Sequence, residues 1–150
     1  MVILLDAMGG DNAPDATIKG AVKAIDQIKA KLMLIGNEDI IKSKIKEFYN
    51  KDISEISDRL EIRNATETIE MEDVPTQAIK RKKDSSMVVG FNMLKTGEGD
   101  VFISAGNSGA LLTGATLLVG RIKGVDRPAL AGILPAYKSR LVLMDCGSNT

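Results

Sequence analysis

Two glycine-rich turns carry the residues in this chain best suited to chemistry. The first, residues 6–14 with the sequence DAMGGDNAP, follows an apolar segment, residues 2–5, that predicts a short buried strand. Gly9 and Gly10 permit backbone conformations that larger residues avoid, and Pro14 suits the first turn of a following helix. A strand that passes through such a turn into a helix presents backbone N–H groups to an anion, with the positive end of the helix dipole behind them.

The second turn, residues 104–110 with the sequence SAGNSGA, repeats this architecture. It follows a compact strand, residues 101–103, and precedes an apolar helix predicted over about residues 108–119. A third polar segment, residues 145–149, follows an apolar strand that ends at Met144. Ligands of open α/β sheets gather beyond the carboxyl ends of the strands, so we expect these three loops to converge on one crevice.

Together the three loops offer the donors of a phosphate site, because backbone amides and hydroxyl groups hold phosphate well. The candidate phosphate-binding residues are Asp6, Gly9, Gly10, Asp11 and Asn12 in the first loop, Ser104, Gly106 and Gly109 in the second, and Asp145, Ser148 and Asn149 in the third. Neither glycine loop matches a nucleotide-binding fingerprint, and the steric alternative, in which the glycines only permit tight turns, stays open. The aspartates could hold magnesium or rigidify the loops, but no second metal motif supports a metal site, and none is predicted.

Composition narrows the functional classes. The chain has 150 residues, 44% of them hydrophobic, which predicts a single domain with one core. Twenty basic and twenty acidic side chains give no net charge, so nucleic acid is not an expected partner. The absence of histidine excludes Ser-His and Cys-His nucleophilic pairs and imidazole zinc sites within this sequence. With a lone cysteine, Cys146, and neither a signal peptide nor a membrane-length apolar run, we expect a cytoplasmic location.

Strand-like and helix-like segments alternate, which predicts an α/β fold of three layers, α/β/α, with helices on both faces of a mostly parallel sheet. Further strands are expected over residues 32–35, 60–64, 129–134 and 141–144, and helices through about residue 29, around residues 41–48, and over residues 74–83 and 85–95. Residues 50–58 are predicted to form a loop. The last two strands, joined by a turn at residues 137–139, predict a hairpin added to the parallel sheet.

Several segments, read together, resemble the phosphate acyltransferase family known as PlsX. They are the two glycine turns with DRPA at residues 126–129, IEM at residues 69–71 and RKKDSSM at residues 81–87. The resemblance covers essentially the whole chain and implies that the chain is the N-terminal part of an enzyme about twice this length. It also implies a fold similar to that of isocitrate dehydrogenase and phosphotransacetylase.

The resemblance implies a reaction and partners. The expected reaction is acyl transfer from acyl carrier protein to inorganic phosphate, which gives acyl phosphate and free carrier protein for bacterial phospholipid synthesis, with no cofactor. A homodimer is implied, as is peripheral membrane association, which we would place in the absent C-terminal part. Lys82 and Lys83, in the densest basic run, could dock the acidic carrier protein, although lysines near a helix end are usually just solvated.

For catalysis, our hypothesis is that the two glycine loops hold phosphate while Asn107, Ser108 or a backbone amide polarises the thioester carbonyl. Two departures from the family pattern stand out: Ser108 replaces a usual threonine, and Cys146 begins CGS where VGA is commoner. Serine keeps the hydroxyl, and Cys146 is predicted to be a small buried residue, not a nucleophile. Two other functions remain open, a phosphotransacetylase-like enzyme acting on acyl-CoA and a non-catalytic phosphate-binding fragment.

Overall fold

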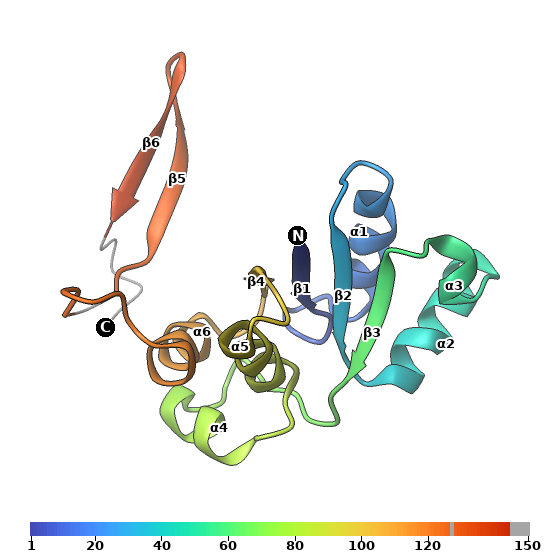
Figure 1. The fold of residues 1–150 in the computed structure, drawn as a ribbon, viewed down its shortest axis with the longest axis horizontal. Coiled ribbons are helices and arrows are strands. Elements are labelled where there is room, and N and C mark those ends of the chain that lie inside the picture. The colour runs from blue at the N-terminus through green and yellow to red at the C-terminus, as the bar shows by residue number, and fades with distance from the viewer. Residues whose placement is uncertain (127, 145–150) are drawn as a thin grey trace.

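A computed structural model describes residues 1–126 and 128–144. Its centre is a four-stranded, all-parallel sheet in the order β3-β2-β1-β4 (Figure 1). The strands are β1 (Val2–Asp6), β2 (Lys31–Gly36), β3 (Leu60–Asn64) and β4 (Val101–Ile103). The helices are α1 (Asp15–Ile25), α2 (Glu38–Tyr49), α3 (Ile53–Ile56), α4 (Pro75–Arg81), α5 (Ser86–Thr96), α6 (Ser108–Gly114) and the π-helical η1 (Ala115–Val119).

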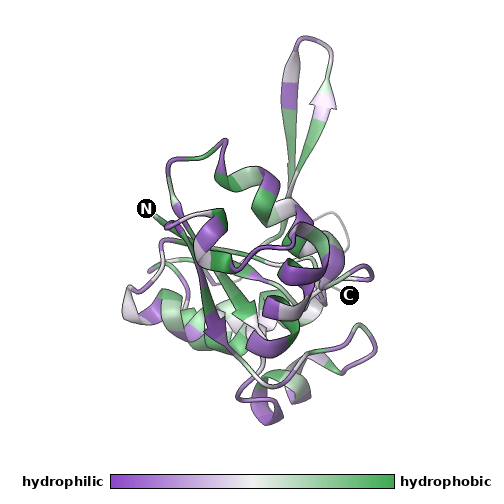
Figure 2. Cartoon of the chain, turned by 90° about the vertical axis from the view of Figure 1, so that its right-hand side faces the viewer, coloured by the Kyte–Doolittle hydropathy of each residue, from purple (hydrophilic) through white to green (hydrophobic). Residues whose placement is uncertain are grey.

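Helices cover both faces of the sheet, which confirms the predicted three-layer α/β/α class. On one face α1 and α2 bury Ile18 and Ile45 against Leu34 of the central strands. On the other face α5 contacts β1, β2 and β4, and α4 and α6 pack outside it (Figure 1). Hydrophobic residues accordingly gather at the centre of the molecule (Figure 2). Burial of these apolar side chains is the main stabilising contribution, at about 25 cal/mol per Å² removed from water.

The register of the sheet brings the two glycine turns to the same edge. Leu5 of β1 lies opposite Leu34 of β2 on one side and Ile103 of β4 on the other. Because all the strands are parallel, their carboxyl ends share one edge, and β1 and β4 are direct neighbours there. The turns after Asp6 and after Ile103 therefore meet side by side.

Some local elements differ from the sequence predictions for identifiable reasons. The first helix ends at Ile25, earlier than predicted, and the Arg59 guanidinium donates to the carbonyl oxygens of Ile25, at 2.7 Å, and Ile28 at this end. Residues 50–58 were predicted to be a loop but contain α3, a single turn with a capping box between Asp52 and Glu55. The long helix predicted after the second glycine turn begins as α6 and continues as η1.

The predicted hairpin forms, but its predicted place in the parallel sheet is wrong. Strands β5 (Ala131–Ala136) and β6 (Ser139–Met144) pair antiparallel with each other as a separate two-stranded sheet that projects from the body (Figure 1). The sequence pattern identifies two strands and a short turn. It does not specify whether a further strand pairs with them. Here η1 and the segment after it carry the chain away from β4, so apolar residues such as Ile133 and Val142 remain exposed.

Within the described residues, no helix has the length and apolar character needed to cross a membrane.

Candidate functional site

The first glycine turn is organised by a buried carboxylate. Asp6, the last residue of β1, is 2% exposed, and its Oδ1 accepts hydrogen bonds from the backbone N–H groups of Met8 and Gly9, both at 3.0 Å. Gly10 follows with a φ of +112°, a conformation that favours glycine. Asp6 therefore stabilises the conformation of the turn through internal hydrogen bonds. This agrees with the alternative in which the aspartates rigidify the loops.

The second turn is joined to the first by a hydrogen bond between residues 98 positions apart. Ser104 Oγ donates to Asp6 Oδ2 at 2.7 Å and accepts from the Gly106 N–H at 3.1 Å. The two turns are in close contact at this point: a Cβ on Gly106 would lie 3.2 Å from Gly9 Cα, and one on Gly9 would lie 3.0 Å from Ser104 Oγ. Larger residues at these two positions would push the turns apart.

We call this junction, made of Asp6, Gly9, Ser104 and Gly106, the loop seam. Its hydrogen bonds occupy the N–H groups of Gly9 and Gly106 inside the turns, so these groups are not directed at a ligand. The expectation of unpaired N–H groups before α1 is also corrected. The Ala13 N–H donates to the Gly10 carbonyl at 3.0 Å, and that of Ala16 donates to the Asn12 carbonyl at 2.9 Å, because the residues before the helix form a turn of their own.

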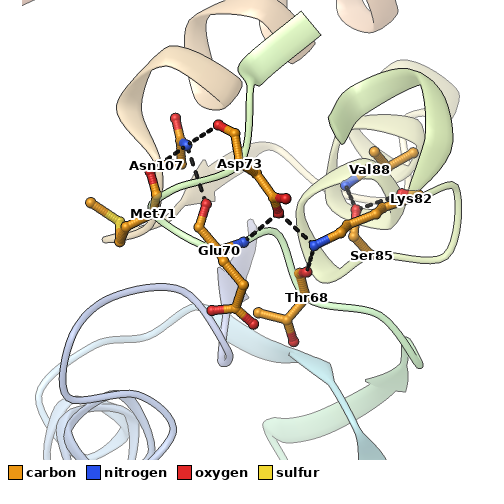
Figure 3. A network of polar contacts seen from close by, with 8 residues as sticks. All are labelled: Thr68, Glu70, Met71, Asp73, Lys82, Ser85, Val88 and Asn107. Atoms are coloured by element: carbon orange, nitrogen blue, oxygen red, sulfur yellow. Dashed lines mark hydrogen bonds and ion pairs between the residues drawn. The ribbon is translucent and has the colours of Figure 1, made fainter. Parts of the chain in front are cut away.

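Asn107 holds the start of α6 and a distant segment together. It is 6% exposed, and its Oδ1 accepts from the Ala110 N–H at 2.9 Å as the helix N-cap. Its Nδ2 donates to the carbonyl oxygens of Glu70, Met71 and Asp73 at 3.1–3.2 Å (Figure 3). Two amide hydrogens serve three acceptors, so the Asn107 side chain is fully engaged within the protein.

The rest of the second turn leads into α6. Ser108 is the first residue of α6 and is exposed. Gly109 is close to α4: a Cβ there would lie 2.7 Å from Pro75 Cγ. The backbone N–H groups of Ser108 and Gly109 belong to the first turn, where an α-helix provides no acceptor of its own.

Lys82 belongs to the same polar network as Asn107 (Figure 3). Its Nζ donates to the Thr68 carbonyl at 2.8 Å and forms an ion pair with Asp73 Oδ2 at 2.5 Å. The hydrogen bond from Lys82, with another from the Glu70 N–H, holds the pKa of Asp73 below its ordinary value of 3.8. Lys82 is thus committed to an internal contact, whereas Lys83, the other predicted docking residue, is exposed.

A cleft of about 370 Å³ borders the loop seam. One wall comes from the first glycine turn and the other from the connection between β3 and α4; its lining residues are Met8, Gly10, Asp11, Ala13, Thr68, Ile69, Glu70, Met71 and Glu72. Its size is within the range of small-ligand sites. Among the described residues, no three His, Cys, Asp or Glu side chains cluster closely enough to hold a metal ion.

The structure thus joins Asp6, Gly9, Ser104 and Gly106 at one seam, with Gly10 beside it and Asp11 in the adjacent cleft. Asn12 is exposed in the turn before α1. The predicted contributions of Asp145, Cys146, Ser148 and Asn149 lie outside the described residues.

Sequence reasoning missed the wall formed by residues 68–73. The available signal was that these polar residues follow β3, whose carboxyl end lies at the same sheet edge.

Comparison with known proteins places the chain in a family. A family model described as "Fatty acid synthesis protein" matches residues 1–150. The chain is 52% identical to a phosphate acyltransferase of Acetivibrio thermocellus, an alignment that covers 100% of this chain and 43% of the relative. It is 49% identical to the phosphate acyltransferases of Clostridioides difficile and Caldanaerobacter subterraneus, covering 99% and 100% of this chain and 43% of each relative. The chain therefore spans less than half the length of these relatives, and it belongs to the PlsX family.

Proposed function

We propose that this chain forms the phosphate-binding part of a phosphate acyltransferase that moves an acyl group from acyl carrier protein to inorganic phosphate. The observation that carries the proposal is the loop seam, where two glycine turns meet at the carboxyl edge of a parallel sheet through the Asp6 to Ser104 hydrogen bond. Relatives about half identical to the chain bear the name phosphate acyltransferase. The expected products are acyl phosphate and the free carrier thiol.

The proposed chemistry needs no histidine. Phosphate is already anionic near neutral pH, so one of its oxygens attacks the thioester carbonyl carbon directly and forms a C–O bond. The tetrahedral intermediate then collapses, the C–S bond breaks, and the sulfur leaves as thiolate and takes a proton from solvent. Positioning the two reactants and stabilising the oxyanion supply the rate enhancement.

The hydrogen bonds within the protein reduce the number of groups that could donate to the oxyanion. Asn107 already serves three carbonyl oxygens and the α6 N-cap, so its part in the proposal is to hold the start of α6 in place. The Ser108 hydroxyl and the backbone N–H groups of Ser108 and Gly109 are the groups that could face the thioester. We retain Ser108 as the side chain proposed to act directly.

The test is phosphate-dependent release of free thiol from an acyl-carrier-protein thioester. The chain should be assayed both alone and extended to the length of its relatives, with acetyl-CoA as a second donor. Release that requires phosphate and prefers the carrier-protein donor supports the proposal. A preference for acetyl-CoA favours the phosphotransacetylase-like alternative, and no release at the relatives' length contradicts phosphate acyl transfer altogether.

Carrier-protein docking is part of the same proposal and now depends on Lys83. Lys83→Glu reverses an exposed charge without breaking the Lys82 contacts. It should raise the KM for the carrier-protein donor and leave the KM for a small thioester unchanged. An exposed charge at the edge of an interface mainly changes the rate at which a charged partner associates. An equal change for both donors would contradict docking through this residue.

The remaining proposals concern the whole protein: it works as a homodimer in the cytoplasm and associates peripherally with the membrane.

A further inference from the structure

The cleft beside the loop seam has a lining unsuited to phosphate. Its lining is mostly polar: Asp11, Glu70 and Glu72 lie along it, and Met8 and Met71 add a smaller apolar part. Like charges repel at short range, so three carboxylates disfavour a phosphate dianion in this space. A neutral chain with amide groups meets no such penalty and could form hydrogen bonds with the polar lining.

The wall that carries Glu70 and Met71 is held by side chains from two other elements. Lys82, just after α4, binds the Thr68 carbonyl and the Asp73 carboxylate, and Asp73 in turn accepts the Glu70 N–H at 2.8 Å (Figure 3). Asn107, just before α6, holds the carbonyl oxygens of the same segment. The wall is thereby fixed at both ends of residues 68–73 while its exposed side chains face the cleft.

The cleft also adjoins the seam. Gly10 lines the cleft, and a Cβ on Gly10 would lie 3.1 Å from the Ala105 carbonyl oxygen in the second turn. A ligand in the cleft and an anion held beside the seam, by backbone N–H groups other than those of Gly9 and Gly106, would therefore be immediate neighbours, as two reactants must be.

We propose that the neutral, thioester-bearing arm of the acyl donor occupies this cleft and that Lys82 is a positioning residue that holds the cleft wall for it. This inference rests on the proposed function and adds to it a place for the donor separate from that of phosphate. Lys82 acts through Asp73 and the Thr68 carbonyl and does not touch the substrate. Loss of the Lys82 contacts leaves residues 68–73 to be ordered when the donor binds, which weakens donor binding.

The test measures KM for each substrate in the protein at the relatives' length. Lys82→Met should raise the KM for the acyl donor about fivefold or more, equivalent to about 1 kcal/mol of binding, and change the KM for phosphate by less than about twofold. Lys82→Arg, which keeps the charge, should recover much of the loss. Lys80→Met, at an exposed lysine of α4 in the same basic run, is the matched control and should leave both values unchanged.

An active wild type whose donor KM is unchanged by Lys82→Met, or whose phosphate KM rises in equal proportion, would overturn the inference. A wild type without phosphate-dependent thiol release would instead refute the proposed function. If Lys82→Met does not fold, Met71→Glu tests the same cleft, because the Met71 side chain is exposed and only its backbone carbonyl takes part in the network. It should raise the donor KM alone, and an unchanged donor KM would again overturn the inference.

Discussion

At the scale of single residues, the Asp6 carboxylate is the centre of the site. Both of its oxygens receive hydrogen bonds, from two backbone N–H groups within its own turn and from the Ser104 hydroxyl of the other. A buried carboxylate is tolerated only when it is paired in this way. The contact therefore stabilises the fold and sets the distance between the two turns at the same time.

Ser104→Ala tests this pairing. The change leaves one buried oxygen of Asp6 without its donor, so the free energy of unfolding should fall by about 1–3 kcal/mol. Ser108→Ala removes an exposed hydroxyl from the same loop and should cost less than about 0.5 kcal/mol. Denaturant unfolding of the two variants provides the comparison, and equal losses would show that the seam contributes nothing of its own.

Asn107 makes two separable contributions. Asn107→Ala removes the α6 cap and the donors to three carbonyl oxygens and should lower the free energy of unfolding by about 2 kcal/mol or more. Asn107→Asp keeps a good capping group but directs a carboxylate at those carbonyls. It should therefore loosen residues 70–73, seen as faster amide exchange there, while α6 keeps its protection. Unchanged exchange in residues 70–73 would mean that the Asn107 amide does not hold this wall.

At the scale of elements, the connection between β3 and α4 is tied to the start of α5. Asp84 accepts hydrogen bonds from the Thr66 hydroxyl and N–H, at 2.6 and 2.9 Å, and Glu67 forms a parallel bridge with Ser85. Together with the Lys82 and Asn107 contacts, these bonds hold the connection along its length. The wall of the cleft is thus built by contacts between elements, because the segment lacks regular secondary structure of its own.

The hydrogen-bonded carboxylate of Asp84 predicts a loss of stability in acid. The Thr66 hydroxyl and N–H hold the pKa of Asp84 below its ordinary value of 3.8. A lowered folded-state pKa means that the stabilisation is fully present above the unfolded value and is lost as pH falls through the folded one. The difference in unfolding free energy between wild type and Asp84→Asn should therefore be constant near pH 6 and shrink below about pH 3.8. Asp58→Asn, at an exposed position, is the control, and a difference for Asp84→Asn that persists in acid would contradict the assignment.

The elements also show which features of the fold can be predicted from sequence patterns. Residues 60–64 and 101–103 were predicted with the observed bounds, because alternating apolar residues in the first and a β-branched and aromatic run in the second both favour strands. The contacts that Arg59 makes with the end of α1 could not be predicted, since Arg59 is distant in sequence. The predicted glycine turns do meet at one edge, but the contacts of Lys82 and Asn107 with residues 68–73 depend on tertiary packing that no local pattern encodes.

At the scale of the whole molecule, the parallel sheet explains why the site is assembled from separate stretches of chain. The neighbours β1 and β4 are distant in sequence, yet their carboxyl ends place the two glycine turns in contact. The cleft and its polar network then lie on one side of the seam. The position proposed for phosphate and the position proposed for the acyl donor are thus neighbours.

Titration of the protein with inorganic phosphate, followed by backbone amide chemical shifts, tests this arrangement most directly. The account predicts that amides of residues 9–12 and 104–109 shift together with a single dissociation constant, while the β5 and β6 amides serve as an unaffected reference. Shifts confined to one turn, or two turns that titrate with different constants, would contradict a single phosphate site at the loop seam.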